Sequence, residues 1–206
     1  LFDLVDESPT GELDSVDSKD FAPVVEACTL CDMCFMTKCP YVPPHEFDLD
    51  FPHLMLRYRA VEHRKGNTSF ADKQLAETDR NGKLAGFIAG ASNWATREGN
   101  PARGVMNAVL GIDSRAHLPT FADVPLTQRA KGNLIPAPNP DAPGFGRKVA
   151  IYASCYGEFN DQMPGEALVK VLAHNGVEVR IEHPQCCGMP KFENGDLPAV
   201  ASNAEA

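Results

Sequence analysis

Apolar residues recur at helical spacing in residues 51–66, FPHLMLRYRAVEHRKG. The side chains of this stripe stand three or four positions apart: Phe51, Leu54, Met55, Tyr58 and Val61. Asp50 suits an N-cap, Pro52 suits the first turn, and Gly66 suits the position past the last turn. The pattern predicts a helix whose basic side chains form a solvated face or dock a partner: Arg57, Arg59, Arg64 and Lys65.

Shorter segments flank this helix. Residues 21–27, FAPVVEA, predict a short helix that Asp20 caps and that leads into a cysteine-rich loop. Residues 67–110 predict further helices, and Gly111 suits the end of the last one. Prolines alternate with small residues towards the end of 112–146, which predicts an extended linker: Pro136, Pro138, Pro140 and Pro143.

Beyond the linker the pattern changes from helical spacing to that of strands. Residues 148–154, KVAIYAS, predict a buried strand, and residues 177–182, VEVRIE, alternate like a second one. A helix is predicted between them, from Pro164 to the glycine at 176. Strand, helix and strand in this order predict a βαβ unit with parallel strands, so the fold class is α+β.

Composition and charge narrow the classes of function. The chain has 206 residues and a net charge of −9, which argues against a general nucleic-acid binder. Residues 1–20 form an acidic lead-in. The most apolar run, residues 84–91, is far shorter than the roughly 20 residues that span a bilayer. The seven cysteines are odd in number and clustered, which favours metal ligation in a reducing compartment, so we expect a cytoplasmic protein.

Four of the cysteines lie in one short run, CTLCDMCFMTKCP: Cys28, Cys31, Cys34 and Cys39. This spacing is close to the bacterial ferredoxin run C-x2-C-x2-C-x3-C-P, whose thiolates ligate [4Fe–4S] clusters. The gap before Cys39 is four residues instead of three. Structural zinc is the alternative, although zinc sites usually use two separated pairs of ligands.

The cluster to which Cys39 belongs is left open by the spacing. In two-cluster ferredoxins the cysteine before the proline ligates the second cluster. Cys28, Cys31 and Cys34 would then lack a fourth ligand in this chain, and an upstream motif would be missing before Leu1. The other arrangement has all four cysteines on one cluster. We expect two clusters and a chain truncated at both ends.

A second group of cysteines surrounds the predicted sheet. Cys155 follows the first strand, and Cys186 and Cys187 follow the second, in HPQCCGMP. Because ligand sites lie at the carboxyl ends of parallel strands, we expect these three side chains to converge. The alternative is that they are ordinary buried cysteines. We expect His183 to face solvent rather than to donate a hydrogen bond to a cluster sulfur.

Three stretches together carry a family resemblance: CTLCDMCFMTKCP, YVPPHEFDLDFPHLMLR, and SCYGEFN with HPQCCGMP. They resemble the iron–sulfur subunit of anaerobic glycerol-3-phosphate dehydrogenase and its relatives among heterodisulfide reductases. The resemblance implies a helical ferredoxin-like domain in residues 1–111 and the first part of a cysteine-rich CCG domain in residues 147–206. It also implies cluster ligation by the first four cysteines and a CCG-type cluster site at Cys155, Cys186 and Cys187.

The sequence has fewer cluster-ligand motifs than this family. It lacks a first ferredoxin motif, the C-x-x-C that completes a CCG site and a second CCG copy, so the CCG cluster would be incomplete in this chain. No nucleophile–base pair is recognisable, so we expect no catalytic residues of substrate oxidation.

Three functions are consistent with these features. The leading one is a redox subunit of an oxidoreductase complex that passes electrons from a flavin dehydrogenase to a quinone or disulfide acceptor. Such a subunit would lack a transmembrane segment and associate peripherally with the inner membrane through its partners. The others are disulfide reduction at the CCG cluster, as in heterodisulfide reductase, and a zinc-stabilised interaction module without redox activity.

Overall fold

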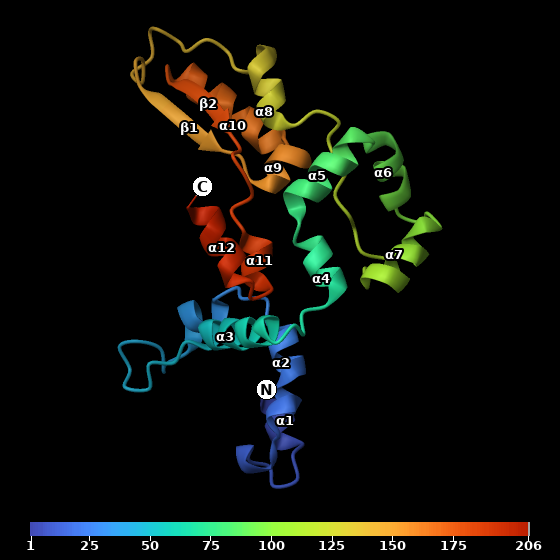
Figure 1. Cartoon of the computed structure of the whole chain (residues 1–206). Coiled ribbons are helices and arrows are strands. Elements are labelled where there is room, and N and C mark those ends of the chain that lie inside the picture. Colours follow the sequence, from blue (N-terminus) through green and yellow to red (C-terminus); the bar gives the residue numbers. More distant parts are fainter. Residues whose placement is uncertain (206) are drawn as a thin grey trace. The chain divides into compact units, whose positions relative to one another are not determined.

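The computed structural model describes residues 1–205, apart from the side chain of Lys38, and it divides into two compact units (Figure 1). Unit 1 contains residues 1–68 and 192–197. Unit 2 contains residues 69–191 and the chain from Pro198 onward. Ala206, the last residue of the predicted CCG segment, lies outside the described residues.

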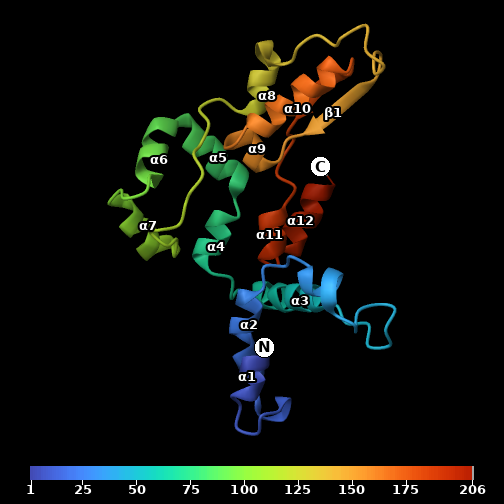
Figure 2. The same cartoon turned by 180° about the vertical axis from the view of Figure 1, so that it is seen from behind.

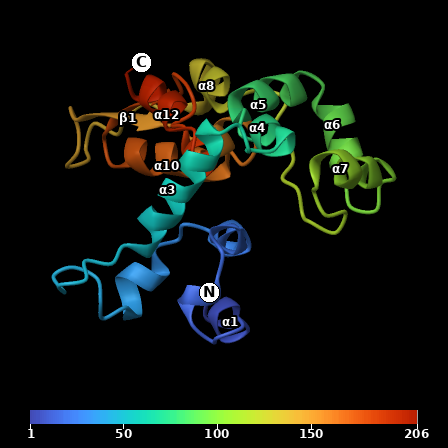
Figure 3. The same cartoon turned by 60° about the horizontal axis from the view of Figure 1, so that its bottom comes forward.

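Unit 1 is helical and contains the first cysteine run. Its helices are α1 (Phe2–Asp6), α2 (Ala22–Ala27) and α3 (Phe51–Arg64), and the long loop between α2 and α3 is visible in Figure 3. Short 3-10 helices at Leu13–Ser15 and Ser18–Phe21 precede α2. The fold class is confirmed at the level of a mixed helical and strand protein.

The predicted cap of α3 is confirmed, whereas the cap of α2 is wrong. Asp50 accepts the backbone N–H of His53 at 3.0 Å. Asp20 instead accepts the backbone N–H of Asp17 at 3.1 Å, in a capping box that opens the 3-10 helix before α2. A 3-10 turn therefore occupies the place where the sequence predicted the start of the helix.

The apolar stripe of α3 is rotated relative to the prediction. Its buried side chains are Pro52, Met55 and Leu56, while Leu54 is 55% exposed. Positions i, i+3 and i+4 make a narrow stripe, and α3 packs against α2 and the cysteine loop. Residues 193–196 of the same unit also contact α3, through Arg59 and His63.

Unit 2 begins with four helices, as predicted: α4 (Phe70–Leu75), α5 (Thr78–Phe87), α6 (Ala89–Thr96) and α7 (Ala102–Leu110). Gly111 ends α7 with a left-handed φ of +69°, a conformation that favours glycine. These helices belong to the same compact unit as the sheet, although the sequence grouped them with the cysteine loop.

The predicted βαβ unit is confirmed. Strands β1 (Lys148–Tyr152) and β2 (Glu178–Glu182) are parallel, with Lys148 opposite Glu178 and Tyr152 opposite Glu182. Helix α10 (Met163–His174) connects them, and α9 (Cys155–Phe159) follows β1 directly (Figure 2). After β2 come α11 (Met189–Glu193) and α12 (Leu197–Ala204).

The two strands differ in burial. Val179 and Ile181 of β2 point into the core, in the predicted alternating pattern. Strand β1 is largely exposed, so the prediction that it is buried was wrong. Helices α8 (Leu126–Arg129) and α10 pack against β2, and within the described residues the sheet has no third strand to cover β1.

The segment predicted to be a linker contributes to the core of unit 2. Leu126 of α8 is 1% exposed and packs in a cluster with Ala153, Val169, Val179 and Ile181. A π-helical turn at Ala130–Leu134 follows α8, and the proline-rich part comes only after it. Residues 112–146 are therefore not extended throughout, because an apolar turn within them is buried.

Gly82→Ala is expected to destabilise unit 2 by about 1–3 kcal/mol, since overpacking a buried site costs roughly that much. A Cβ atom at this position of α5 would lie 2.4 Å from Cγ and Cδ2 of Phe159. Gly104→Ala in α7 is the matched control, because no atom lies within 4 Å of its Cβ position, and it should stabilise by about 0.5–1 kcal/mol. Urea unfolding measures both, and equal effects would contradict the packing of α5 on α9.

Candidate functional site

The first strand delivers Cys155 to the carboxyl edge of the sheet. Cys155 is the first residue of α9, and the side chain of Ser154 caps that helix by accepting the backbone N–H of Gly157 at 3.1 Å. The strand-to-helix transition therefore begins at the cysteine itself. Its side chain is partly buried.

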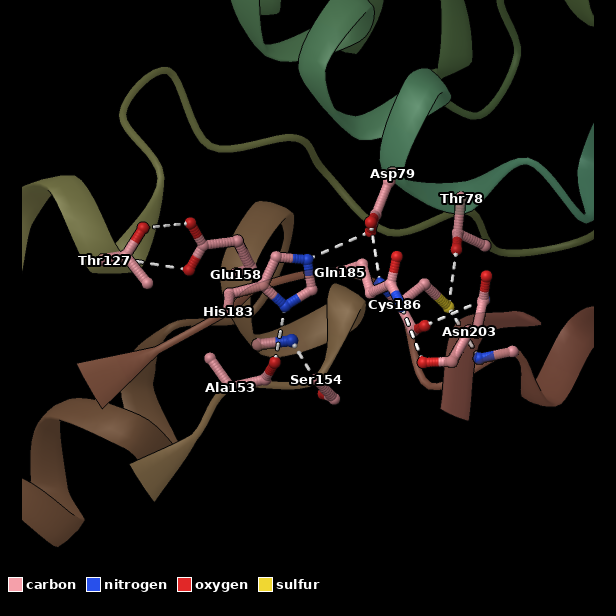
Figure 4. A network of polar contacts seen from close by, with 12 residues as sticks. Thr78, Asp79, Thr127, Ala153, Ser154, Glu158, His183, Gln185, Cys186 and Asn203 are labelled. Carbon is pink, nitrogen blue, oxygen red and sulfur yellow. Dashed lines mark hydrogen bonds and ion pairs between the residues drawn. The ribbon is translucent and has the colours of Figure 1, made fainter. Parts of the chain in front are cut away.

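The second strand delivers Cys186, whose polar groups all have partners in the described structure. Its Sγ accepts hydrogen bonds from the Thr78 hydroxyl at 3.2 Å and from the backbone N–H of Gly188 at 3.4 Å. Its backbone N–H donates to Asp79 Oδ2 at 2.7 Å, and its carbonyl accepts from Asn203 Nδ2 at 3.1 Å (Figure 4). Cys186 is 9% exposed, so its sulfur is held in one buried position.

The three cysteines of the sheet edge are neighbours. Burial raises the pKa of the Cys155 thiol, the Thr78 hydroxyl lowers it by hydrogen bonding, and Cys186 raises it again by its charge and a side-chain hydrogen bond. The pKa of Tyr152 is raised by burial and then by the charges of Cys187, Cys186, Asp79 and Cys155. Cys155 therefore lies near Cys186, and a cluster site shared by all three cysteines stays a prediction. Cys187 is the exposed member of the group.

His183 does not face solvent, contrary to the prediction. Its side chain is 4% exposed. Nδ1 lies 2.7 Å from the carbonyl oxygen of Ala153, and Nε2 lies 3.0 Å from Asp79 Oδ1 (Figure 4). Both ring nitrogens therefore face oxygen atoms of the protein, one from β1's end and one from α5.

Helix α9 closes the far side of the histidine. The ring of Phe159 makes an edge-on contact with His183, with centroids 5.5 Å apart. The neighbouring Glu158 is buried and accepts hydrogen bonds from the backbone N–H and hydroxyl of Thr127 (Figure 4). Phe159 is thus part of the packed site.

Thr78 and Asp79 are the residues of this site that the sequence did not reveal. They lie in the first turn of α5, more than a hundred residues before Cys186. No local motif singles them out. Asp79 bridges the backbone of Cys186 and the ring of His183, so a single carboxylate joins α5 to the loop after β2.

The first cysteine run forms a loop in unit 1. Leu30 and Asp32, which stand on either side of Cys31, have left-handed φ angles of 53° and 58°, an uncommon conformation for residues with a side chain. Cys31 and Cys34 are exposed, whereas Cys28 and Cys39 are partly buried. Hydrogen bonds from the backbone of Met33 and the side chain of Thr29 lower the pKa of Cys31.

The extra residue before Cys39 coincides with a change of helix type. Cys34–Lys38 is a π-helical turn, which accommodates one more residue per turn than an α-helix. The four-residue gap therefore has a local structural explanation.

Arg59 supports this loop from α3. Its guanidinium donates to the carbonyl oxygen of Val25 at 2.7 Å and to that of Cys28, at the end of α2, and to the carbonyl oxygen of Glu193 at 3.1 Å. A cation at a helix C-terminus satisfies carbonyl groups that lack helical partners. Arg59 therefore has an internal role, unlike the solvated basic side chain that the sequence suggested.

Both groups of cysteines have the donor chemistry of an iron–sulfur site, because thiolates are the usual cluster ligands. In the part of the chain that the structure describes, no three Cys, His, Asp or Glu side chains are already arranged to hold a metal ion. Among the described residues, no helix has the length and apolar character needed to cross a membrane.

The sheet edge and its cysteines lie in a stretch of sequence that matches a known family. Residues 149–204 match the family model of the CCG cysteine-rich domain. This stretch of the chain contains β1 from its second residue onward, β2, and the three cysteines that follow these strands. Thr78 and Asp79 lie outside the matched residues and contact the cysteine loop within them.

Two curated relatives are similar to part of the chain. The chain is 30% identical over 122 residues to the C subunit of anaerobic glycerol-3-phosphate dehydrogenase from Escherichia coli strain K12, and equally to that from Escherichia coli O157:H7. The aligned region covers 59% of this chain and 29% of each relative, so the chain spans well under half of the proteins it matches. No solved structure is significantly similar to the chain. The resemblance inferred from the cysteine motifs is confirmed.

Proposed function

We propose that the chain is an iron–sulfur electron-transfer subunit of an anaerobic dehydrogenase complex. The observation that carries this proposal is the position of three cysteines just after two parallel strands, inside a stretch that matches the CCG domain. If the three were ordinary core cysteines, all of them would be expected to be buried. Cys187 is instead exposed. The similarity to a dehydrogenase subunit supports the same function.

The proposed ligands fall into two groups. Cys28, Cys31, Cys34 and Cys39 would ligate one or two [4Fe–4S] clusters in a helical domain. A second set would contribute to a CCG-type cluster that needs at least one further ligand: Cys155, Cys186 and Cys187. The clusters would supply one-electron transfer. The chain would supply thiolates, burial and hydrogen bonds, which together set the reduction potential.

The proposed partners follow from the named relatives. Both are subunits of a glycerol-3-phosphate dehydrogenase, so a flavin dehydrogenase subunit is the proposed electron donor. The proposed acceptor is a quinone or a disulfide. Such a complex would lie on the cytoplasmic side, associated peripherally with the membrane.

Protein purified without oxygen is expected to be brown, to contain iron and inorganic sulfide, and to lose visible absorbance when dithionite is added. Replacing Cys31 and Cys34 by serine should remove most of the iron bound in unit 1, because these exposed thiols are proposed ligands. Met36→Leu is the matched control in the same loop, since Met36 is exposed and lacks a thiol. Iron analysis and visible spectra provide the measurement.

A colourless protein that contains zinc and no iron would contradict the proposed function and support an interaction module. Disulfide reduction at the CCG site is separated by a second assay, in which a reduced artificial donor and a small disulfide are supplied. Turnover there, abolished by Cys187→Ser, would favour disulfide reduction over simple electron transfer.

A further inference from the structure

We propose that Thr78 is a positioning residue for the sulfur of Cys186 and sets how tightly this sulfur binds a metal. The inference rests on the proposed function, because it takes Cys186 as a metal ligand. Thr78 lies outside the CCG match at 149–204, and its hydroxyl nevertheless donates to Cys186 Sγ at 3.2 Å. The contribution of α5 to the site is therefore separate from that of the CCG domain itself.

The surroundings of the sulfur leave it little freedom. Gly188 donates its backbone N–H to the same Sγ at 3.4 Å, with a φ of +90°. This left-handed conformation favours glycine and turns the N–H back towards the cysteine two residues earlier. Thr78 and Gly188 thus donate to the sulfur from two separate segments of unit 2.

The backbone of Cys186 is fixed as firmly as its side chain. Asp79 accepts its N–H at 2.7 Å, and Asn203 donates to its carbonyl oxygen at 3.1 Å. Because Thr78 and Asp79 are consecutive residues of one helical turn, α5 holds both the main chain and the sulfur of the same cysteine (Figure 4). The sulfur is therefore preorganised before any metal binds.

The chemistry of the hydroxyl fits this role. A donor to sulfur stabilises the thiolate, which is the form that binds metals. Groups that hydrogen-bond to metal ligands typically change metal affinity by about 10–100-fold when they are removed.

The test compares Thr78→Val, which keeps the shape and loses the hydroxyl, with Thr78→Ser, which keeps the hydroxyl. The full-length, metal-free, reduced protein is titrated with Cd²⁺, a soft metal that binds thiolates. Alkylation by iodoacetamide is then followed for each cysteine by peptide mass spectrometry. The quantity measured is the Cd²⁺ concentration that half-protects Cys186.

We expect this concentration to rise about tenfold in Thr78→Val and to stay within about twofold of the wild type in Thr78→Ser. Half-protection of Cys31 in unit 1 is the internal reference and should not change in either variant. A general loss of structure would affect both hydroxyl-retaining and hydroxyl-lacking variants, so rescue by serine distinguishes positioning from folding. Thr78→Ala replaces the valine variant if that one does not fold.

The proposal is overturned if Thr78→Val protects Cys186 like the wild type, or if Cd²⁺ does not protect Cys186 in the wild type at all. These results are independent of the iron analysis. Iron present with no effect of Thr78→Val would leave the proposed function standing and remove this inference. Tenfold weaker Cd²⁺ binding in Thr78→Val, with no iron taken up by the wild type, would leave this inference standing and remove the proposed function.

Discussion

Asp79→Ala is expected to lower the free energy of unfolding of unit 2 by about 3 kcal/mol, since a buried polar group that loses its partner costs about 1–3 kcal/mol. The substitution removes the acceptor of two groups at once: Nε2 of His183 and the backbone N–H of Cys186. The His183 side chain has almost no access to water that could replace the carboxylate. Urea unfolding followed by the fluorescence of Trp94, the single tryptophan, reports on unit 2.

Asp141→Ala is the control for this loss of a carboxylate. Asp141 is exposed in the same unit, so its removal should change stability by less than about 0.5 kcal/mol. Asp79→Asn keeps one oxygen acceptor of the same size and should have an intermediate effect. If Asp79→Ala unfolded at the same urea concentration as Asp141→Ala, the carboxylate would not connect α5 to the cysteine loop.

Leu126→Ala is expected to destabilise unit 2 by about 2–5 kcal/mol, the usual range for truncating a buried leucine. Leu126 is almost fully buried among Val169, Val179 and Ile181. The packing is close, because a Cβ atom at Gly165 would lie 2.7 Å from Leu126 Cδ2. The cavity left by alanine would therefore lie against both β2 and α10.

The matched control is Leu84→Ala in α5, where the leucine is 64% exposed. Its effect should stay within about 0.5 kcal/mol, because it removes little buried apolar area. The same urea titration serves both variants. Similar midpoints for Leu126→Ala and Leu84→Ala would restore the view that residues 112–146 are a linker without a part in the core.

The elements that the sequence predicted best have strong local signals. The Asp50 cap, the glycines that end α7 and α10, and the alternation in β2 depend on neighbouring residues alone. Parallel pairing then follows from the order of strand, helix and strand. The convergence of Cys155 and Cys186 could be predicted for the same reason, because both follow the strands directly.

The features that were missed depend on contacts between distant parts of the chain. Asp79 and Thr78 reach Cys186 across more than a hundred residues, and no pattern near either end indicates it. The burial of His183 follows from the same contact. Leu126 was overlooked because prolines later in its segment dominated the interpretation, although a single apolar turn before them packs in the core.

The shared anchoring of Cys186 by Thr78 and Asp79 has a consequence for the life of the protein in the cell. The sulfur is in place only when α5 and the loop after β2 are folded together, so a metal at this site binds the folded unit in preference to the unfolded chain. Binding to the folded form alone raises apparent stability in proportion to the logarithm of metal concentration. Under the proposed function, loss of the metal would then lower the apparent stability of unit 2, so the metal-free protein would open to proteases more often.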